Sequence, residues 1–336
     1  MQYLEMRAAD DMHLHLRQGA QLVAYARDAA RSFARGLVMP NTLPPLASPE
    51  SVRAYGRQIE EAAPGFTPLL TFKILPHMDA GLVRSLKEAG AVAGKLYPEG
   101  VTTHAEDGVR DVEGLFPVFE AMAEEGLVLC IHAESPGAPV LEREAAFHET
   151  FLRIHHAVPS LRIVFEHVSD ARTVALIRTL PPDKVAGTIT LHHLLFTLDD
   201  LLGGRLNPHL FCKPVVKTSA DRDALREAAF SGDPHFFFGS DSAPHPREKK
   251  EREGAAGCYT APYALEALAS LFEAHGVLGV LEGFVSERGA RFYGLLLNEE
   301  RVVLRKEEWV VPAEYHGVVP ACAGMRLGWR VVEKGR

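Results

Sequence analysis

The sequence predicts an α/β fold, a (β/α)8 TIM barrel with a small C-terminal return segment. Three observations lead to this class: eight short apolar runs, amphipathic stretches between most of them, and no Pro/Gly/Ser-rich linker within 336 residues. Strands that alternate with helices form parallel β-α units, and eight such units close into a barrel. We therefore expect a single barrel domain spanning residues 1–336, and one that depends on a metal.

The eight apolar runs have the lengths of buried strands. They cover residues 10–16, 36–41, 67–75, 91–98, 127–134, 162–169, 185–194 and 235–244. The helical patterns between them cover residues 20–34, 48–62, 113–125, 139–156, 170–179 and 220–230. Two further helical patterns, 262–274 and 276–288, complete the barrel, and residues 295–336 form the irregular and extended return segment. The long polar stretch 98–111 follows the fourth run, which places it at the carboxyl-terminal face of the barrel.

The composition is that of an ordinary globular protein. Hydrophobic residues make up 47% of the chain, charged residues 24%, and the net charge is −8. This balance, without a Lys/Arg-rich run, argues against a nucleic-acid partner, and the mixed-sign stretch REKKEREG at 247–254 predicts a solvated loop. We expect a small-molecule substrate, whose anionic groups would have to be bound by local donors because the whole protein does not attract anions.

The cysteines and the N-terminus predict a cytoplasmic protein. Cys130, Cys212, Cys258 and Cys322 are widely spaced and form no C-x-x-C pair, which argues against a disulfide framework and against a thiolate zinc site. The first residues lack the layout of a signal peptide, and no apolar run has the length of a membrane span, so we expect no membrane association.

The first apolar run carries an unusual polar face. In AADDMHLHLRQGA, residues 8–20, His13, His15 and Arg17 alternate with apolar residues. Successive strand residues point to opposite faces, so these three side chains share one face. That face is either solvated or one half of a metal site, and this short pattern alone does not decide between them.

Later runs place further polar residues at their carboxyl-terminal ends, namely Asn41, Lys95, His132, His167 and Asp241. Each has an ordinary alternative, since a strand histidine can be a hydrogen-bonded core residue, a lysine can extend to solvent and an aspartate can cap a turn. In this fold, however, the carboxyl-terminal end of the strands carries the chemistry. The convergence of all these residues at one end predicts a metal site.

The candidate donors suit zinc, which accepts imidazole nitrogen and carboxylate oxygen. A protonated lysine cannot bind a metal, but burial lowers the pKa of an amine. The neutral amine of Lys95 can combine with CO₂ to give a carbamate, an anionic group with two oxygens that can bridge two metal ions.

The sequence resembles the shorter, monofunctional bacterial dihydroorotases of the amidohydrolase superfamily. The resemblance runs from about residue 8 to residue 295 and rests on motifs that follow one another in order. They are HLHLRQG (13–19), VMPNT (38–42), KLYPEGVTT (95–103), IHAE (131–134), FEHVS (165–169), NPHLFCKP (207–214) and GSDSAPH (239–245). As a set these motifs are highly specific, although H-x-H alone is weak.

The resemblance implies a (β/α)8 barrel that holds two zinc ions per subunit, bridged by N6-carboxylated Lys95. The implied metal ligands are His13, His15, Lys95, His132, His167 and Asp241. His13, His15 and Asp241 would bind one ion, and His132 and His167 would bind the second. The implied substrate-binding residues are Arg17, Asn41 and His245 for a carboxylate, Thr102 and Thr103 on a mobile loop, and main-chain groups at Lys213 and Ala256. Some relatives have leucine in place of Lys213, so only a main-chain role is carried over there.

The implied activity is reversible cyclisation of N-carbamoyl-L-aspartate to L-dihydroorotate in pyrimidine biosynthesis, with a hydroxide between the zinc ions as nucleophile and Asp241 as proton shuttle. Relatives are commonly homodimers, and some associate with aspartate transcarbamoylase. Three alternatives remain open: another cyclic amidohydrolase such as a hydantoinase or allantoinase, a non-catalytic scaffold subunit for aspartate transcarbamoylase, and an unrelated barrel with a structural histidine cluster. We interpret His192 and His193 as structural, and nothing specific supports a role for His104.

Overall fold

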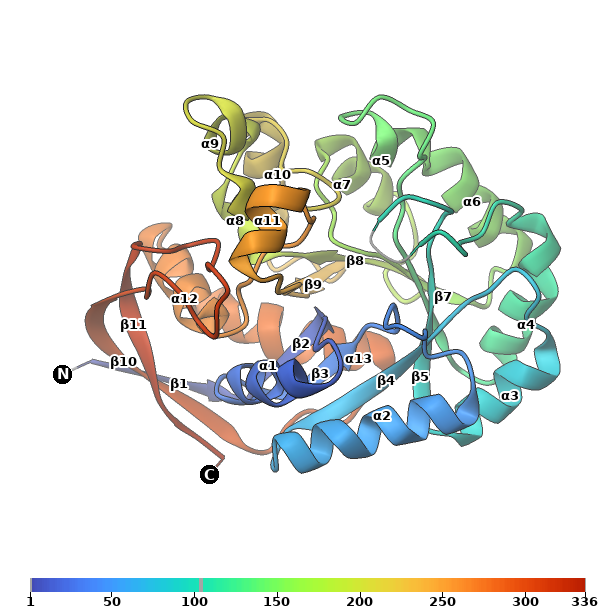
Figure 1. Cartoon of the computed structure of the whole chain (residues 1–336), viewed down its shortest axis with the longest axis horizontal. Coiled ribbons are helices and arrows are strands. Elements are labelled where there is room, and N and C mark those ends of the chain that lie inside the picture. Colours follow the sequence, from blue (N-terminus) through green and yellow to red (C-terminus); the bar gives the residue numbers. More distant parts are fainter. Residues whose placement is uncertain (1, 103–104, 336) are drawn as a thin grey trace.

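The computed structural model describes residues 2–102 and 105–335. Eight parallel strands form one sheet in the order of the sequence, and they surround a central axis (Figure 1). The strands are β2 (Ala9–Leu14), β3 (Phe33–Val38), β4 (Thr67–Lys73), β5 (Ala91–Leu96), β6 (Val128–Ile131), β7 (Arg162–Phe165), β8 (Val185–Ile189) and β9 (Phe236–Phe238).

The barrel closes where the segment after β9 meets β2. The Asp241 amide donates to the His13 carbonyl at 2.8 Å, and the His15 amide donates to the Ser242 carbonyl at 3.0 Å. The eighth apolar run was predicted to extend over 235–244, but its strand ends at Phe238 and the following residues are irregular. The predicted (β/α)8 barrel is confirmed, and the closing hydrogen bonds bring the ends of its first and last strands together.

The helices pack around the outside of the barrel (Figure 1). They are α1 (Ala20–Ala30), α2 (Pro49–Ala62), α3 (Ala80–Glu88), α4 (Phe116–Glu124), α5 (Arg143–Ala146), α6 (His148–Ala157), α7 (Ala171–Ile177), α8 (Leu191–Leu195), α9 (Leu198–Leu202), α10 (Ser219–Phe230), α11 (Arg247–Glu253), α12 (Ala264–Ala274) and α13 (Arg288–Tyr293). Shorter turns are η1 (Glu113–Leu115), η2 (Pro208–Leu210), η3 (Leu278–Val280) and the wider turn η4 (Gly283–Glu287). Several helices begin at capping side chains, which satisfy free amides of the first turn.

Three expected elements differ from the structure. The helical pattern at 139–156 is divided into α5 and α6, and the pattern at 276–288 is divided into η3, η4 and the start of α13. The expected loop at 247–254 instead contains the helix α11. Its charges pair one turn apart, with Arg247 to Glu251 at 3.1 Å and Arg252 to Glu248 at 2.6 Å. Such pairs stabilise exposed helices, which explains why this charged stretch is not a loop.

The return segment forms a small antiparallel sheet beside the barrel. It contains β1 (Tyr3–Arg7), which was not predicted, together with β10 (Arg301–Val310) and β11 (Arg326–Lys334), in the order β1–β10–β11. Burial alternates along β10, so one face packs inward, and the fully buried Trp329 of β11 lies in the main core. Within the described ranges, no helix has the length and apolar character that crossing a membrane requires.

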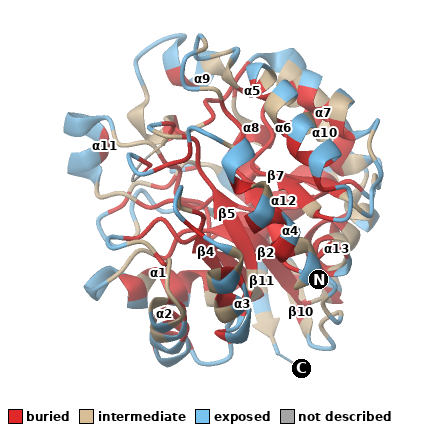
Figure 2. Ribbon diagram, turned by 90° about the vertical axis from the view of Figure 1, so that its right-hand side faces the viewer, coloured by how far each residue is buried: buried red, intermediate tan, exposed pale blue. Residues whose placement is uncertain are grey.

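Most residues of the barrel strands are buried, and the exposed surface lies mainly on the helices and loops (Figure 2). A group of apolar side chains from the strands fills the barrel interior and includes Met12, Leu37, Val164 and Phe237. Polar and charged side chains gather instead where the strands end, which leaves the carboxyl-terminal end of the barrel as the place for chemistry.

Candidate metal centre

Strand β2 and the segment after β9 bring two histidines and an aspartate together. Oδ1 of Asp241 lies 3.1 Å from Nε2 of His15 and 3.4 Å from Nε2 of His13. Ligand atoms of all three residues lie within 4.8 Å of one another. Because barrel closure places the last strand end beside the first, residues that are far apart in the sequence form one compact donor group.

The other two histidines continue this group. The ring centres of His13 and His167 are 5.2 Å apart, and those of His167 and His132 are 4.5 Å apart. His132 follows β6 and His167 follows β7, and both line the same pocket as His13, His15 and Asp241. The structure thus gathers the four predicted histidines and the predicted aspartate at one end of the barrel.

Lys95 is fully buried near the end of β5. Among the described residues, its Nζ has no hydrogen-bond partner, and it lies 5.4 Å from the centre of the Tyr97 ring. Burial lowers the pKa of this amine, against the opposing charge of Glu166. An unpartnered buried ammonium is costly, whereas a carbamate made from the neutral amine could bind cations, so the surroundings of Lys95 fit the predicted group.

The pKa shifts of His15, His167 and Asp241 favour the forms that bind a metal ion. Burial lowers the pKa of His15 to about 4 and lowers that of His167 well below its usual range. Burial opposes ionisation of Asp241, but the hydrogen bond from His15 and the charge of His13 together hold its pKa below the usual range. Neutral imidazoles and an ionised carboxylate are the forms that bind metal ions.

Three residues of the site have left-handed backbone conformations, which are uncommon for residues other than glycine. The φ angles are 59° at Arg17, 44° at His167 and 43° at Asp241. Such conformations cost free energy and concentrate at functional sites. They also interrupt the alternation of a strand, so that side chains at these positions point where a regular strand would not direct them.

Glu166 is a functional residue that the sequence analysis missed. Nδ1 of His13 lies 2.6 Å from Oε2 of Glu166, and the Thr188 hydroxyl donates to the same oxygen at 2.6 Å. This contact fixes the His13 ring so that Nε2 faces Asp241, as carboxylates do for metal-binding histidines. A regular strand would point neighbouring Glu166 and His167 to opposite sides, so alternation alone could not predict that both serve the site.

Glu134 and Tyr97 were also missed. Nε2 of His132 donates to Oε2 of Glu134 at 2.7 Å, which fixes the orientation of that ring as well. The Tyr97 ring lies 6.2 Å from the His132 ring, centre to centre, and lines the pocket. The motif IHAE placed Glu134 close to a candidate ligand in sequence, and this proximity was the one available signal for it.

A group that could bind a carboxylate borders the histidines. Nε of Arg17 donates to the Pro244 carbonyl at 3.0 Å, and its Nη2 lies 3.0 Å from Nε2 of His245. The same Nε2 lies 3.0 Å from the Ala256 carbonyl. If Nε2 of His245 donates to that carbonyl it cannot accept from Arg17, and one N–H of the guanidinium then remains available for an anion.

The remaining predicted substrate contacts fall on the same pocket. Its lining includes Arg17, Asn41, Thr102, Lys213 and Ala256. Thr103 and His104 lie outside the described residues. The pocket therefore joins the candidate donors to a wall that could orient a small anionic molecule.

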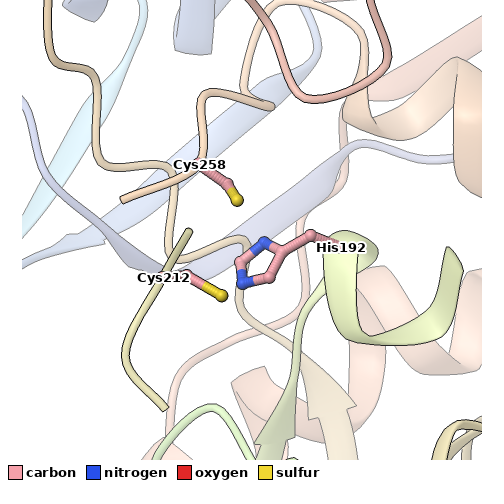
Figure 3. A group of neighbouring side chains, drawn as sticks. All are labelled: His192, Cys212 and Cys258. Carbon is pink, nitrogen blue, oxygen red and sulfur yellow. The ribbon is translucent and has the colours of Figure 1, made fainter. Parts of the chain in front are cut away.

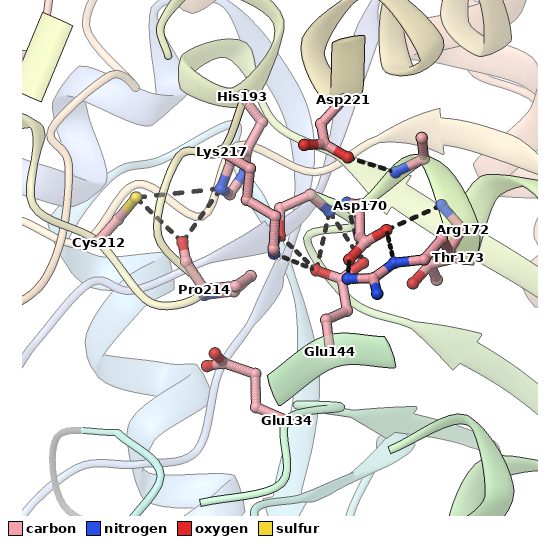
Figure 4. Close-up of polar contacts among 12 residues, drawn as sticks. Glu134, Glu144, Asp170, Arg172, Thr173, His193, Cys212, Pro214, Lys217 and Asp221 are labelled. Atoms are coloured by element: carbon pink, nitrogen blue, oxygen red, sulfur yellow. Dashed lines mark hydrogen bonds and ion pairs between the residues drawn. The ribbon is translucent and has the colours of Figure 1, made fainter. Parts of the chain in front are cut away.

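A buried polar network holds the segment after β7 (Figure 4). The carboxylate of Glu144 accepts from the amides of Ser169 and Asp170 at 3.1 Å, and Lys217 donates to it at 3.1 Å. Nearby, Nε2 of His193 donates to the Pro214 carbonyl at 3.1 Å. These contacts support the structural interpretation of His193 and fix the loops that surround the pocket.

Fold and site together define the class of protein: a barrel of the amidohydrolase fold with donors for metal at the carboxyl-terminal end of its strands. No family model matches the chain. It is 41% identical over 344 residues to a dihydroorotase of Pseudomonas aeruginosa (strain UCBPP-PA14), with 99% of each chain covered. The chain belongs to the dihydroorotase family.

Two solved structures support the same conclusion. A dihydroorotase from Saccharomyces cerevisiae, in complex with 5-fluoroorotic acid, has a TM-score of 0.95 and 35% identity, with all of both chains covered. A dihydroorotase from Campylobacter jejuni has a TM-score of 0.91 and 37% identity, with 98% of each chain covered. The expected membership and fold are confirmed.

Proposed function

We propose that this chain catalyses the reversible cyclisation of N-carbamoyl-L-aspartate to L-dihydroorotate, a step of pyrimidine biosynthesis. The observation that carries the proposal is the His13–His15–Asp241 group with Arg17 on the wall of the same pocket. The histidines and aspartate offer metal ligands beside the position of the reacting amide, and the guanidinium offers a partner for the carboxylate that substrate and product share.

The residues proposed to hold two zinc ions are His13, His15, Lys95 as its carbamate, His132, His167 and Asp241. Three observations support this assignment: the close approach of the donors, the unpartnered buried Nζ of Lys95, and the carboxylates that orient the His13 and His132 rings. When bound, zinc supplies Lewis-acid chemistry, lowering the pKa of water and polarising a carbonyl group.

Asp241 is proposed to move the proton. In hydrolysis, its carboxylate accepts a proton from the attacking water and passes it to the ring nitrogen as the C–N bond breaks. In synthesis, the ureido nitrogen attacks the side-chain carboxyl carbon and gives its N–H proton to Asp241. Asp241 passes this proton to the departing hydroxyl oxygen, so that the C–N bond forms, the C–O bond breaks and water leaves. Its position within 3.4 Å of both His13 and His15 keeps the carboxylate directed at the centre of the site.

The substrate carboxylate is proposed to bind Arg17, Asn41 and His245, while main-chain groups at Lys213 and Ala256 contact the ring. Arg17, Asn41, Lys213 and Ala256 line the pocket, and His245 contacts Arg17. Thr102 also lines the pocket, and together with Thr103 it is proposed to cover bound substrate. The resemblance further implies a homodimer, which light scattering on the purified protein would test. The cysteines and the N-terminus predict a cytoplasmic location.

The rival activities differ in what they require of the site. A hydantoinase-like or allantoinase-like enzyme would use the metal ligands without the Arg17 group, and a scaffold subunit for aspartate transcarbamoylase would need neither. The decisive experiment measures L-dihydroorotate hydrolysis and N-carbamoyl-L-aspartate cyclisation by the purified protein, with zinc content determined on the same sample. We expect turnover in both directions, and preferential turnover of hydantoin or allantoin would refute the proposal.

Carboxylation of Lys95 has its own test. After incubation with ¹³C-bicarbonate, the zinc-loaded protein should show a carbamate carbon signal in its NMR spectrum. The Lys95→Ala variant should lack that signal. If the signal is the same in both proteins, the carbamate is on another residue and the assignment to Lys95 is wrong.

A further inference from the structure

A second group of potential metal ligands lies behind the wall of the pocket. It consists of His192 in α8, Cys212 after η2 and Cys258, which pairs with Ser242 in the segment after β9. One ligand atom from each residue lies within 4.8 Å of the others, and all three residues are fully buried. In Figure 3 both sulfur atoms point toward the imidazole of His192.

The imidazole of His192 is unusual within this group. Neither of its ring nitrogens has a hydrogen-bond partner among the described residues. The adjacent His193 is fully engaged, with Nδ1 2.9 Å from the Thr190 hydroxyl and Nε2 3.1 Å from the Pro214 carbonyl. Buried polar groups are nearly always partnered, so an imidazole that faces two thiols without a hydrogen bond is a candidate metal ligand.

We propose that His192, Cys212 and Cys258 bind a zinc ion through one imidazole nitrogen and two thiolates. Zinc accepts this donor set, with bonds of about 2.3 Å to sulfur and 2.0–2.1 Å to nitrogen, and tetrahedral geometry then separates the donors by about 3.6–3.8 Å. A shift of about 1 Å in a side chain would bring the group from its present spacing to that geometry. The site is separate from the proposed catalytic centre, which contains no sulfur ligand.

This proposal departs from the sequence-based prediction that the widely spaced cysteines form no thiolate zinc site. That expectation rested on ligands close in sequence, as in C-x-x-C. Here the tertiary structure assembles the donors instead. The Gly257 amide donates to the Phe211 carbonyl at 2.9 Å, which joins the two segments that carry the cysteines.

The ion would stabilise one wall of the pocket. Lys213 follows Cys212 directly, Ala256 and Gly257 directly precede Cys258, and these three residues line the pocket. Nζ of buried Lys250 donates to the carbonyls of Phe211 and Gly257, both at 2.7 Å, so the same two segments are already held from the other side. A metal between them would fix the main-chain groups that are proposed to contact the substrate ring.

Zinc can bind the two cysteines only after their thiols lose their protons. The thiol of Cys212 donates to the Pro214 carbonyl at 3.2 Å, and that of Cys258 donates to the His209 carbonyl at 3.6 Å. A contact with Cys258 and burial hold the pKa of Cys212 well above its usual range, while Lys250 acts in the opposite direction. Zinc binding would therefore release two thiol protons to solvent, and the affinity should rise with pH.

The test uses Co²⁺ as a spectroscopic probe in the reduced, full-length protein. Cobalt bound to thiolate gives a sulfur-to-metal charge-transfer band in the near ultraviolet, and cobalt bound only to nitrogen and oxygen does not. We expect this band in the wild-type protein and its loss on addition of Zn²⁺. Cys212→Ala and Cys258→Ala should lose the band, and Cys322→Ala, which removes a buried thiol from another core cluster, should keep it.

The wild-type measurement decides the matter even if a variant fails to fold. Absence of the charge-transfer band, while visible cobalt absorption shows that the nitrogen and oxygen donors are loaded, would overturn the proposal. Retention of the band in both Cys212→Ala and Cys258→Ala would also overturn it. If the purified protein contains a Cys212–Cys258 disulfide, the disulfide is reduced first, and absence of the band after reduction would likewise overturn the proposal. These readouts do not depend on dihydroorotate turnover, so failure of the proposed activity would leave the test intact.

Discussion

Two buried groups of potential ligands lie at the same end of the barrel, and they differ in chemistry and access. The centre around His13, His15 and Asp241 offers nitrogen and oxygen and lines a pocket. The group of His192, Cys212 and Cys258 offers nitrogen and sulfur and is fully enclosed. A metal site that lines a pocket can admit substrate, whereas a metal site enclosed by protein can only hold segments together. The comparison sets a centre proposed to carry the chemistry beside a group proposed to stabilise the wall of its pocket.

The strongest test of the open centre is removal of its proposed proton carrier. Asp241→Asn should lower kcat for L-dihydroorotate hydrolysis by about 10²–10⁴-fold, the usual contribution of general acid–base catalysis. Steady-state kinetics with metal analysis of the same sample would check this. The exposed Asp183→Asn serves as a matched control and should retain wild-type kcat. Near-normal kcat in Asp241→Asn would remove the proton-transfer role.

The pocket wall should contribute to substrate selection through Arg17. Arg17→Ala should lower kcat/KM for L-dihydroorotate by about 10–150-fold, because a hydrogen bond to a charged group contributes about 1.5–3 kcal/mol. Most of the change should appear as a higher KM, with a smaller decrease in kcat. Dihydrouracil, which lacks the carboxylate, should show little change. Equal losses on both substrates would contradict carboxylate recognition by Arg17.

The orientation of the donors in the open centre should depend on Glu166. Glu166→Gln should weaken zinc binding by about 10–100-fold, as is typical for residues that orient metal ligands. Competition with a chelator would measure the affinity. Excess zinc should restore much of the lost kcat if Glu166 acts by positioning His13, and unaltered zinc affinity would exclude that role.

The two segments that carry Cys212 and Cys258 should depend on Lys250 for their stability. Lys250→Met removes the ammonium that bonds the Phe211 and Gly257 carbonyls, and it leaves the buried Gly257 oxygen without that donor. We expect a loss of about 1–3 kcal/mol in the free energy of unfolding. Urea denaturation would measure it, with the exposed neighbour Lys249→Met as control. Equal stability of the two variants would show that Lys250 does not hold these segments.

The sequence predicted most of the open centre because strand periodicity and strand ends are local properties. His13 and His15 alternate along one run, and the other ligands stand at the ends of later runs, so a barrel necessarily gathers them. Local sequence patterns gave a wrong prediction for α11. The charged stretch was predicted to be a solvated loop, but its charges pair one turn apart along a helix. Local patterns also failed for β1, because pairing with β10 links opposite ends of the chain.

The sequence by itself determined the barrel class, the position of the chemistry at one end and the residue types that could bind metal. Only the tertiary structure decided which carboxylates orient the histidines and which cysteines meet His192. The physical reason is that contacts between distant segments depend on barrel closure and on local departures from strand geometry, such as the left-handed backbone at His167 and Asp241. No periodicity along the chain encodes these features.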